Sequence, residues 1–379
     1  MKYHEISQLV SEILVNWTVF GHQCTRPVKK KEFKYCTMGV CRLLILATLF
    51  FVGAYGIDCN KNLLPDLSYK LSGTELAFPS LPRYKHGVPY TLAKFSLKSK
   101  GCKAVLEPFP CWSIQEEGNC DALQNVIDFV IDANDIMWVL DLGICNTLEQ
   151  PIRRCPPKIV AINAATGVVI QVVDLSPFIL PDSRPQYILA DYSPSGTAFI
   201  YIADAGTGSI LVYNVSLGKV NRIVLPAAAV PENRDVLYIA LVRKTCGNVL
   251  YLTYLSSPKL FSIRADLIYQ GQSNGCVVES GVNPPGTKIV FLGTDNGAAL
   301  FFRYKGESDI YIWNTETCFR PENFLLVQKG GDCRLATQVV PGYKRLMWAL
   351  ESNFFDYISN TVGCLGASMV VQPLIKTCD

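Results

Sequence analysis

The chain has 379 residues, 49% of them hydrophobic and 18% charged, and a formal net charge of +3. Seven of the 35 Lys and Arg and three of the 32 Asp and Glu precede Ile57, so the remainder carries 28 basic and 29 acidic residues, a net charge of −1. That balance gives no electrostatic case for a nucleic acid or an anionic membrane surface as a partner.

The first feature along the chain is an apolar run at Leu43–Val52, preceded by Arg42. The run is shorter than the roughly 20 residues that span a bilayer, and it matches the apolar region of a secretory signal peptide. Ala54 and Gly56 supply the small residues expected at positions −3 and −1 of a cut before Ile57.

We therefore predict three segments. Residues 1–37 form an upstream leader absent from the mature protein, residues 38–56 form the signal peptide, and residues 57–379 form one secreted, extracellular domain. The alternative is a cytoplasmic arm followed by a signal anchor, which the short apolar run disfavours.

Cysteine number agrees with secretion. Three of the 15 cysteines precede Ile57, which leaves 12, an even number that suits paired disulfides in an oxidising compartment. None of the 12 forms a CxxC pair and histidine is scarce, so we predict neither a metal site nor a cofactor. Five cysteines lie close enough in sequence to favour local disulfides, with their connectivity left open: Cys102, Cys111, Cys120, Cys145 and Cys155.

A repeat of about fifty residues dominates the remaining chain. Short strands rich in apolar and aromatic residues begin at Leu76, Met137, Ile200, Leu250, Leu300 and Leu346. Most are followed by a turn and a second strand. One example is the strand KIVAIN, the turn AATG and the strand VVIQVV. Another is AFIYIADAGTGSILVYNV, in which Gly206 and Gly208 lie at the bend. Such pairs are typical of antiparallel hairpins.

Units of this length with about four strands each are typical of β-propeller blades. The sequence therefore predicts an all-β fold, a six-bladed β-propeller of four-stranded antiparallel blades. A pair of β-sandwiches or another repeat is the alternative. The propeller leaves a central channel surrounded by loops, where function usually resides. Asn214-Val-Ser216 is in addition an acceptor site for N-glycosylation in a secreted chain.

No self-contained catalytic motif is present, and we predict no catalytic residue. His86 is the one histidine after the signal, and its sequence context, PRYKHGVP, favours a turn. Gly206–Gly208 lacks the third glycine and the helix of a dinucleotide loop. Glu116 and Glu117 are expected in a solvated loop, and Asp132 is expected to begin the turn before the strand at Met137.

Several stretches, in order along the chain, resemble the yellow/major royal jelly protein family of arthropods. They are Pro82–Leu92, Pro110–Trp112, Met137–Asp141, Cys155–Val160, Phe199–Asn214, Trp313–Asn314 with Pro321–Asn323, and Leu346–Asn353. The resemblance runs from about Asn60 to Asn360 and implies a secreted six-bladed propeller. Family members have a longer segment before the first matching strand, so we expect the first blade or the strand that closes the ring to be incomplete.

The resemblance also implies a function. Salivary members bind serotonin and catecholamines in the central channel, through positions that match Thr337, Asn353 and Phe355 here, with Phe354 as the substitute if the register shifts. Hydroxyl and amide groups suit an amine or phenol, and an aromatic wall suits a ring or a cation. The alternative for Phe354 and Phe355 is a place in the blade core.

The prediction is thus a protein that binds a small aromatic amine or catechol, with its oligomeric state open. It has two alternatives: a structural or nutritive secreted glycoprotein, and a dopachrome-converting protein of melanin formation. The last lacks an evident general base in the sequence.

Overall fold

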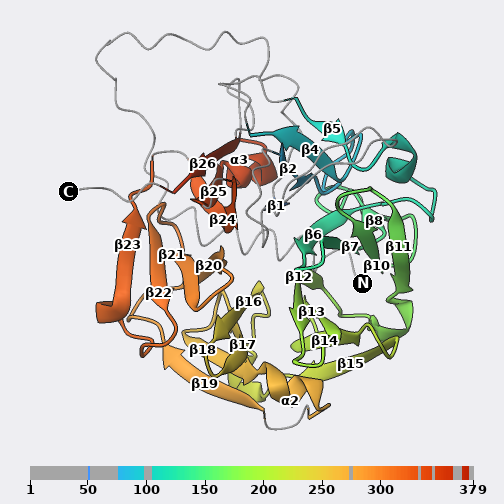
Figure 1. Cartoon of the computed structure of the whole chain (residues 1–379). Coiled ribbons are helices and arrows are strands. Elements are labelled where there is room, and N and C mark those ends of the chain that lie inside the picture. Colours follow the sequence, from blue (N-terminus) through green and yellow to red (C-terminus); the bar gives the residue numbers. More distant parts are fainter. Residues whose placement is uncertain are drawn as a thin grey trace, which may run out of the picture.

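The computed structural model describes residues 50–51, 76–97, 105–272, 276–331, 334–343, 346–361 and 369–374. The predicted leader, most of the predicted signal peptide and Cys102 lie outside these residues. Antiparallel sheets follow one another around a ring in chain order, from the blue β2, β4 and β5 to the red β24–β26 (Figure 1). The six-bladed propeller is confirmed.

Four blades have four antiparallel strands each. Their strands are β6 (Val126–Ile131), β7 (Ile136–Asp141), β10 (Lys158–Asn163) and β11 (Val169–Asp174); β12 (Pro185–Tyr192), β13 (Ala198–Asp204), β14 (Ser209–Asn214) and β15 (Lys219–Val224); β16 (Leu237–Lys244), β17 (Gly247–Tyr254), β18 (Lys259–Arg264) and β19 (Val277–Val282); and β20 (Ile289–Thr294), β21 (Ala299–Tyr304), β22 (Ile310–Asn314) and β23 (Phe324–Gln328).

The first and last sheets have three strands each within the described residues. They are β2 (Leu76–Ala77), β4 (Ala93–Ser96) and β5 (Glu107–Pro108), and β24 (Leu335–Gly342), β25 (Leu346–Ser352) and β26 (Met369–Pro373). Two further pairs join β1 (Phe50–Phe51) to β3 (Pro79–Ser80) and β8 (Ile144–Cys145) to β9 (Ile152–Arg153). β1 falls inside the predicted signal peptide.

Helices are short. The described α-helices are α2 (Ala265–Tyr269) and α3 (Phe354–Ser359), and the 3-10 helices are η2 (Trp112–Gln115), η3 (Ser176–Phe178), η4 (Ala227–Ala229) and η5 (Pro321–Asn323). The predicted hairpins are present, and the Gly206–Gly208 bend joins β13 to β14. Gly206 is required there, because a Cβ would lie 1.7 Å from the carbonyl oxygen of Asp182.

Five of the six repeated aromatic strands predicted from the sequence are the second strands of their blades, namely β7, β13, β17, β21 and β25, whereas the one at Leu76 is β2, an edge strand of its sheet. They are buried over most of their length, whereas the outermost strands β11 and β15 alternate between exposed and partly buried residues. Each blade is covered on both faces by its neighbours, so its second strand is apolar at most positions, and its outer edge shows the period of a half-exposed strand.

Two of these second strands end in a buried aspartate that positions the inner strand of the same blade. Asp141 is fully buried and accepts N–H hydrogen bonds from Gln124 and Asn125, each at 2.8 Å. Asp204, also fully buried, accepts the N–H of Arg184 at 2.7 Å. The donating residues precede β6 and β12, so each aspartate that ends the repeat motif fixes the channel-facing strand of its own blade.

A buried arginine anchors the PRYKHGVP segment against the start of β6. Arg83 is 2% exposed, and its guanidinium donates to five backbone carbonyl oxygens, at 2.5–3.2 Å. The acceptors are Val88, Leu123, Gln124, Pro89 and Gln115. Its own backbone N–H donates to Asn125 Oδ1 at 2.7 Å.

The ring closes through packing and one lysine. Leu350 joins an apolar cluster with Phe78 and Phe129, which brings the last blade against the first. The ammonium of Lys85 donates to Asn360 Oδ1 at 2.6 Å and to the carbonyl of Tyr357, and lies 4.3 Å from the Tyr357 ring centroid. These contacts tie the loop after β3 to α3.

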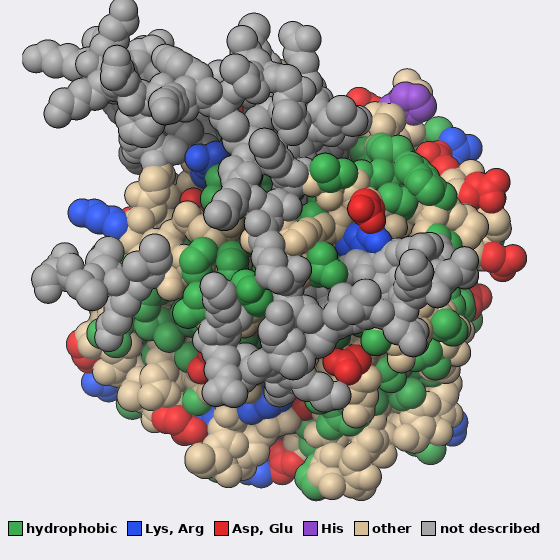
Figure 2. Space-filling view, turned by 45° about the horizontal axis from the view of Figure 1, so that its top comes forward, with side chains coloured by type: hydrophobic (Ala, Val, Ile, Leu, Met, Phe, Trp, Pro, Cys, Tyr) green, Lys and Arg blue, Asp and Glu red, His purple; other side chains and the backbone are tan. Residues whose placement is uncertain are grey.

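Charge on one face of the molecule is mixed. The side chains visible on the face drawn in Figure 2 include acidic, basic and hydrophobic types without a large patch of one sign. This agrees with the near-neutral balance of the sequence after Ile57.

Candidate functional site

A cavity of about 600 Å³ lies at the centre of the ring. It is lined mainly by the innermost strands β6, β12, β16, β20 and β24 and by the turns that follow them, which surround the centre in Figure 1. This volume is in the range of small-molecule sites.

Three aromatic rings from successive inner strands form one wall of the cavity. The ring centroids of Tyr187 and Tyr238 are 5.5 Å apart, and those of Tyr238 and Phe291 are 6.2 Å apart. All three residues line the cavity. We call them the aromatic belt. They provide a surface on which an aromatic ligand can stack.

Asp128 lines the cavity at the level of the belt. In the β-ladders Asp128 is paired with Leu140, Tyr187 with Ala203 and Tyr238 with Thr253, each next to the last residue of its second strand. Asp128 is 5% exposed, and its Oδ2 accepts the N–H of Ile188 at 2.9 Å.

Burial has the largest effect on the pKa values of Asp128, Tyr187 and Tyr238. It raises the pKa of Asp128 to about 7, against the backbone N–H groups of Ile188 and Phe129, which lower it. Burial raises the pKa of Tyr187 well above its usual value and that of Tyr238 to about 12. The phenols therefore stay protonated at neutral pH while Asp128 titrates there.

Two further carboxylates lie near the other end of the inner strands. Asp132 Oδ2 accepts Trp138 Nε1–H and the Tyr192 hydroxyl, each at 2.7 Å, and Oδ1 accepts two backbone N–H groups. Asp191 accepts the side-chain amide of Asn248 at 2.7 Å, the Tyr192 backbone N–H, and the hydroxyls of two further tyrosines. Both aspartates are buried and line the cavity.

The charged residues that line the cavity are three aspartates, Asp128, Asp132 and Asp191, and one arginine, Arg243. A second guanidinium, that of Arg303, is buried near the phenols, where it donates to the Ala336 carbonyl at 2.7 Å, but it is not a lining residue. The lining therefore carries an excess of acidic groups.

The three predicted ligand-binding residues are in different positions relative to the cavity. Thr337 lines it, and its hydroxyl donates to the Leu350 carbonyl at 3.3 Å. Asn353 precedes α3 and Phe355 lies in the first turn of that helix, and neither is a lining residue. The ladder pairs Leu335 with Ser352, so Asn353 lies beside the start of β24.

Sequence reasoning missed the belt and Asp128. Their positions precede each repeated aromatic strand by one hairpin, so the repeat locates the strands that carry them but not the residues themselves. The buried Oε1 of Gln338, which also lines the cavity, has no hydrogen-bond partner within the described residues.

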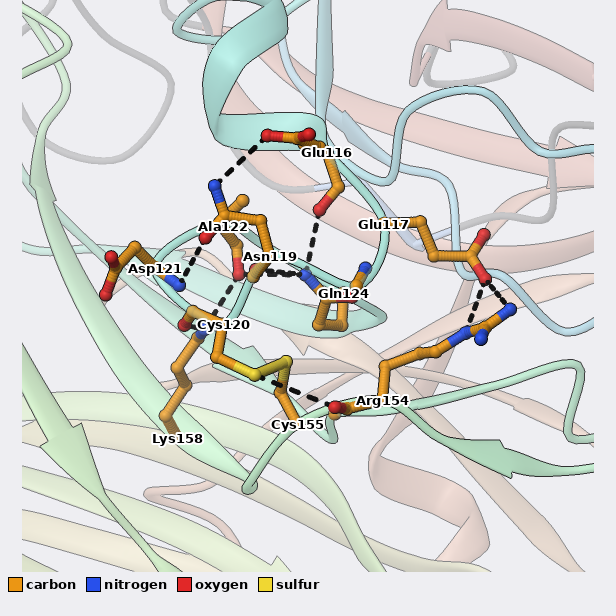
Figure 3. The surroundings of a disulfide bond; sticks show 12 residues. Glu116, Glu117, Asn119, Cys120, Asp121, Ala122, Gln124, Arg154, Cys155 and Lys158 are labelled. Atoms are coloured by element: carbon orange, nitrogen blue, oxygen red, sulfur yellow. Dashed lines mark hydrogen bonds and ion pairs between the residues drawn. A yellow bond between two sulfur atoms is a disulfide. The ribbon is translucent and has the colours of Figure 1, made fainter.

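One disulfide joins two of the predicted cysteines. Cys120 and Cys155 are bonded, with their Cα atoms 5.3 Å apart, between the loop before β6 and the segment before β10. Figure 3 shows this bond beside the Arg154–Glu117 ion pair, 2.8 Å long, and Lys158, whose ammonium donates to the Ala122 carbonyl. Cys111 and Cys145 are not disulfide-bonded within the described residues.

Replacing both Cys120 and Cys155 with serine is expected to lower the free energy of unfolding by about 2–4 kcal/mol, because the bond closes a loop with a sequence separation of 35. Urea unfolding of the oxidised proteins measures the loss. Cys111→Ser, at a half-buried thiol in contact with Ser113, is the control and should change the stability by less than about 1 kcal/mol. Equal stability of the double variant and the control would contradict the prediction.

The remaining residues singled out in the sequence lie in turns, loops and at a strand end. His86 lies exposed in a turn, where its N–H donates to Glu149. Asn214 ends β14 and is half-buried, and its Oδ1 accepts the N–H of Leu217. Glu116 and Glu117 are exposed loop residues.

Within the described residues no His, Cys, Asp or Glu cluster suited to a metal ion occurs, and no helix there is long and apolar enough to cross a membrane.

Fold and cavity together define a six-bladed propeller with a lined central channel. The sequence profile of the major royal jelly proteins matches residues 124–378, more than half of the chain. The chain belongs to the major royal jelly protein family, as the motif resemblance indicated.

Individual relatives are distant. Major royal jelly protein 8 of Apis mellifera is 21% identical over 298 residues, which are 72% of this chain and 71% of that protein. Major royal jelly protein 9 of the same species is 25% identical over 299 residues, 72% and 67% of the two chains. Dopaminechrome tautomerase of Drosophila melanogaster is 29% identical over 173 residues, 44% of this chain and 35% of that protein.

Solved structures that align with this chain include a virginiamycin B lyase from Staphylococcus aureus. The TM-score is 0.44 at 14% identity, and the alignment covers 88% of this chain and 89% of that one. Regucalcin from Agrobacterium tumefaciens gives a TM-score of 0.46 at 15% identity, with 86% and 95% covered. At these scores the assignment of the propeller rests on the sheets of this chain.

Proposed function

We propose that this protein is secreted and binds a small aromatic amine or catechol in its central channel. The observation that carries the proposal is the aromatic belt inside a cavity of about 600 Å³ whose lining holds three aspartates and one arginine. An aromatic cation fits this lining, because its ring can stack on the belt and its positive charge is attracted by the aspartates.

The polar groups of the lining fit such a ligand. The buried Oε1 of Gln338 accepts from any donor that enters, which would supply the partner that the described residues do not. Thr337 offers a hydroxyl on the same strand. Asn353 and Phe355 complete the proposed binding set if α3 moves toward the channel when the ligand enters.

Titration calorimetry of the secreted, oxidised chain with serotonin, dopamine and noradrenaline tests this function. We expect saturable binding with a Kd below about 100 μM, and a loss of about tenfold or more for Thr337→Val if the hydroxyl donates to or accepts from the ligand. Ser216→Ala, which removes the sequon at a residue outside the cavity lining, is the control and should bind as the wild type does.

Absence of binding by a correctly folded wild type at high micromolar ligand would remove this function. A structural or nutritive role for the glycoprotein would then be the better account. A mass spectrum of the secreted protein tests the accompanying expectations: a chain that begins at Ile57 and a glycan on Asn214 support secretion through the predicted signal, and peptides from residues 1–37 contradict it.

A second candidate is conversion of dopaminechrome, because one relative is a dopaminechrome tautomerase and because Asp128 supplies what the sequence did not show, a carboxyl that titrates near neutral pH inside the cavity. A tautomerase shifts a proton within its substrate and needs such a group. Following the absorbance of dopaminechrome tests it. A decay no faster than in buffer alone excludes this activity.

A further inference from the structure

The three carboxylates of the cavity differ in how their oxygen atoms are already used. Asp132 accepts four hydrogen bonds: two from backbone N–H groups, one from Trp138 and one from Tyr192. Asp191 also accepts four, from Asn248, Tyr201, Tyr269 and a backbone N–H. A carboxylate has about four acceptor positions, so both groups are saturated by the protein itself.

Asp128 is different. The hydrogen bonds that the described residues give it come from the backbone N–H groups of Ile188 and Phe129. Two phenols lie close enough for a charge on Asp128 to raise their pKa, those of Tyr84 after β3 and Tyr187 on β12. The largest influences on its pKa are burial, which raises it, and these two N–H groups, which lower it. It is thus a buried carboxyl on the cavity wall, held by amides and faced by neutral groups.

We propose that Asp128 is the counter-ion for the ammonium group of the channel ligand, and therefore the residue that selects an amine over a neutral catechol. This rests on the proposed function. The ammonium would occupy the acceptor positions that the two amides leave, and the ring of the ligand would stack on the adjacent belt. Tyr84 and Tyr187 stay protonated because burial raises the pKa of both phenols, so neither competes as an anion.

Binding is then coupled to a proton. With a pKa of about 7, Asp128 is mostly protonated at pH 6 and mostly ionised at pH 8. An ammonium favours the ionised form, so entry of an amine below pH 7 releases a proton to the solvent. A neutral catechol carries no positive charge that favours the ionised form of Asp128, so it binds without proton release.

Calorimetry with dopamine and 4-methylcatechol tests the inference on the secreted, oxidised full chain. For the wild type we expect dopamine to bind at least about tenfold tighter than 4-methylcatechol at pH 8, and about tenfold weaker at pH 6 than at pH 8. Titrations at pH 6.5 in buffers of different ionisation enthalpy should show release of about half a proton or more per dopamine.

Asp128→Asn should remove the preference for dopamine, its pH dependence and the proton release, and should keep the affinity for 4-methylcatechol. Asp235→Asn is the matched control: Asp235 is a buried carboxyl whose pKa is also raised by burial, but it does not line the cavity, so this variant should behave as the wild type.

The outcomes separate this inference from the function on which it rests. If the wild type binds both compounds with equal affinity, or if Asp128→Asn retains the preference, Asp128 is not the counter-ion while the channel remains a binding site. If the folded wild type binds neither compound, the proposed function fails and this inference with it.

Discussion

Replacing Arg83 with methionine is expected to lower the free energy of unfolding by about 3–5 kcal/mol. The guanidinium is 2% exposed and donates to five carbonyl oxygens from three separate stretches of chain. Methionine fills a similar volume but leaves these acceptors without their donor, and each buried, unsatisfied acceptor costs about 1–3 kcal/mol before the structure relaxes. Urea unfolding monitored by circular dichroism measures the change.

Arg154→Met is the matched control for Arg83. The Arg154 side chain is 39% exposed and pairs with Glu117 at the surface, where an ion pair contributes at most about 1 kcal/mol. A loss for Arg83→Met no larger than for Arg154→Met would show that the carbonyl oxygens find other donors. Since Arg83 also anchors the segment before β6, the larger loss should be accompanied by weaker ligand binding.

Asp128→Asn is expected to raise the free energy of unfolding at pH 8, by up to about 4 kcal/mol, and to change it little near pH 4. The pKa of Asp128 is about 7 in the folded protein and has an ordinary value of 3.8. Between these values the folded state binds more protons than the unfolded state, so the wild type loses stability as the pH rises from about 4 to 7. Asparagine removes that loss and still accepts the Ile188 N–H.

Unfolding of both proteins at pH 4, 6 and 8 measures this difference. Asp141→Asn is the control, because Asp141 is a fully buried acceptor of three backbone N–H groups and lies 3.7 Å from the Lys158 ammonium. That variant should be less stable than the wild type at pH 6 and pH 8. A stability difference between the wild type and Asp128→Asn that does not vary with pH would contradict the assigned ionisation.

The propeller could be predicted from the sequence because its strongest signal lies on the second strand of each blade. Strands such as Ile136–Asp141 and Ala198–Asp204 are buried on both faces and must be apolar or aromatic at almost every position. Their recurrence reports the number of blades. Even the aspartate that ends two of them has a structural cause, since Asp141 and Asp204 hold the backbone that leads into the channel-facing strand of the same blade.

The channel lining could not be predicted in the same way. Asp128, Tyr187 and Tyr238 lie on inner strands whose sequences share no motif, and only the pairing register brings them to one level. The resemblance to the family indicated Thr337, which lines the cavity, together with Asn353 and Phe355, which are not lining residues. Spacing left the disulfides open as well, since five neighbouring cysteines allow many pairings and the bond joins Cys120 to Cys155.

The direction of the inner strands gives the channel two chemically different ends. Asp128 lies near the start of β6 and Asp132 just beyond its end, about 13 Å apart at the rise of an extended strand. A single-ring amine is shorter than this, so a molecule held at Asp128 leaves the end at Asp132 to water or to a second molecule. The stoichiometry of the channel is then free to exceed one, and a longer ligand would meet a carboxyl with open acceptor positions at Asp128 but a fully hydrogen-bonded one at Asp132.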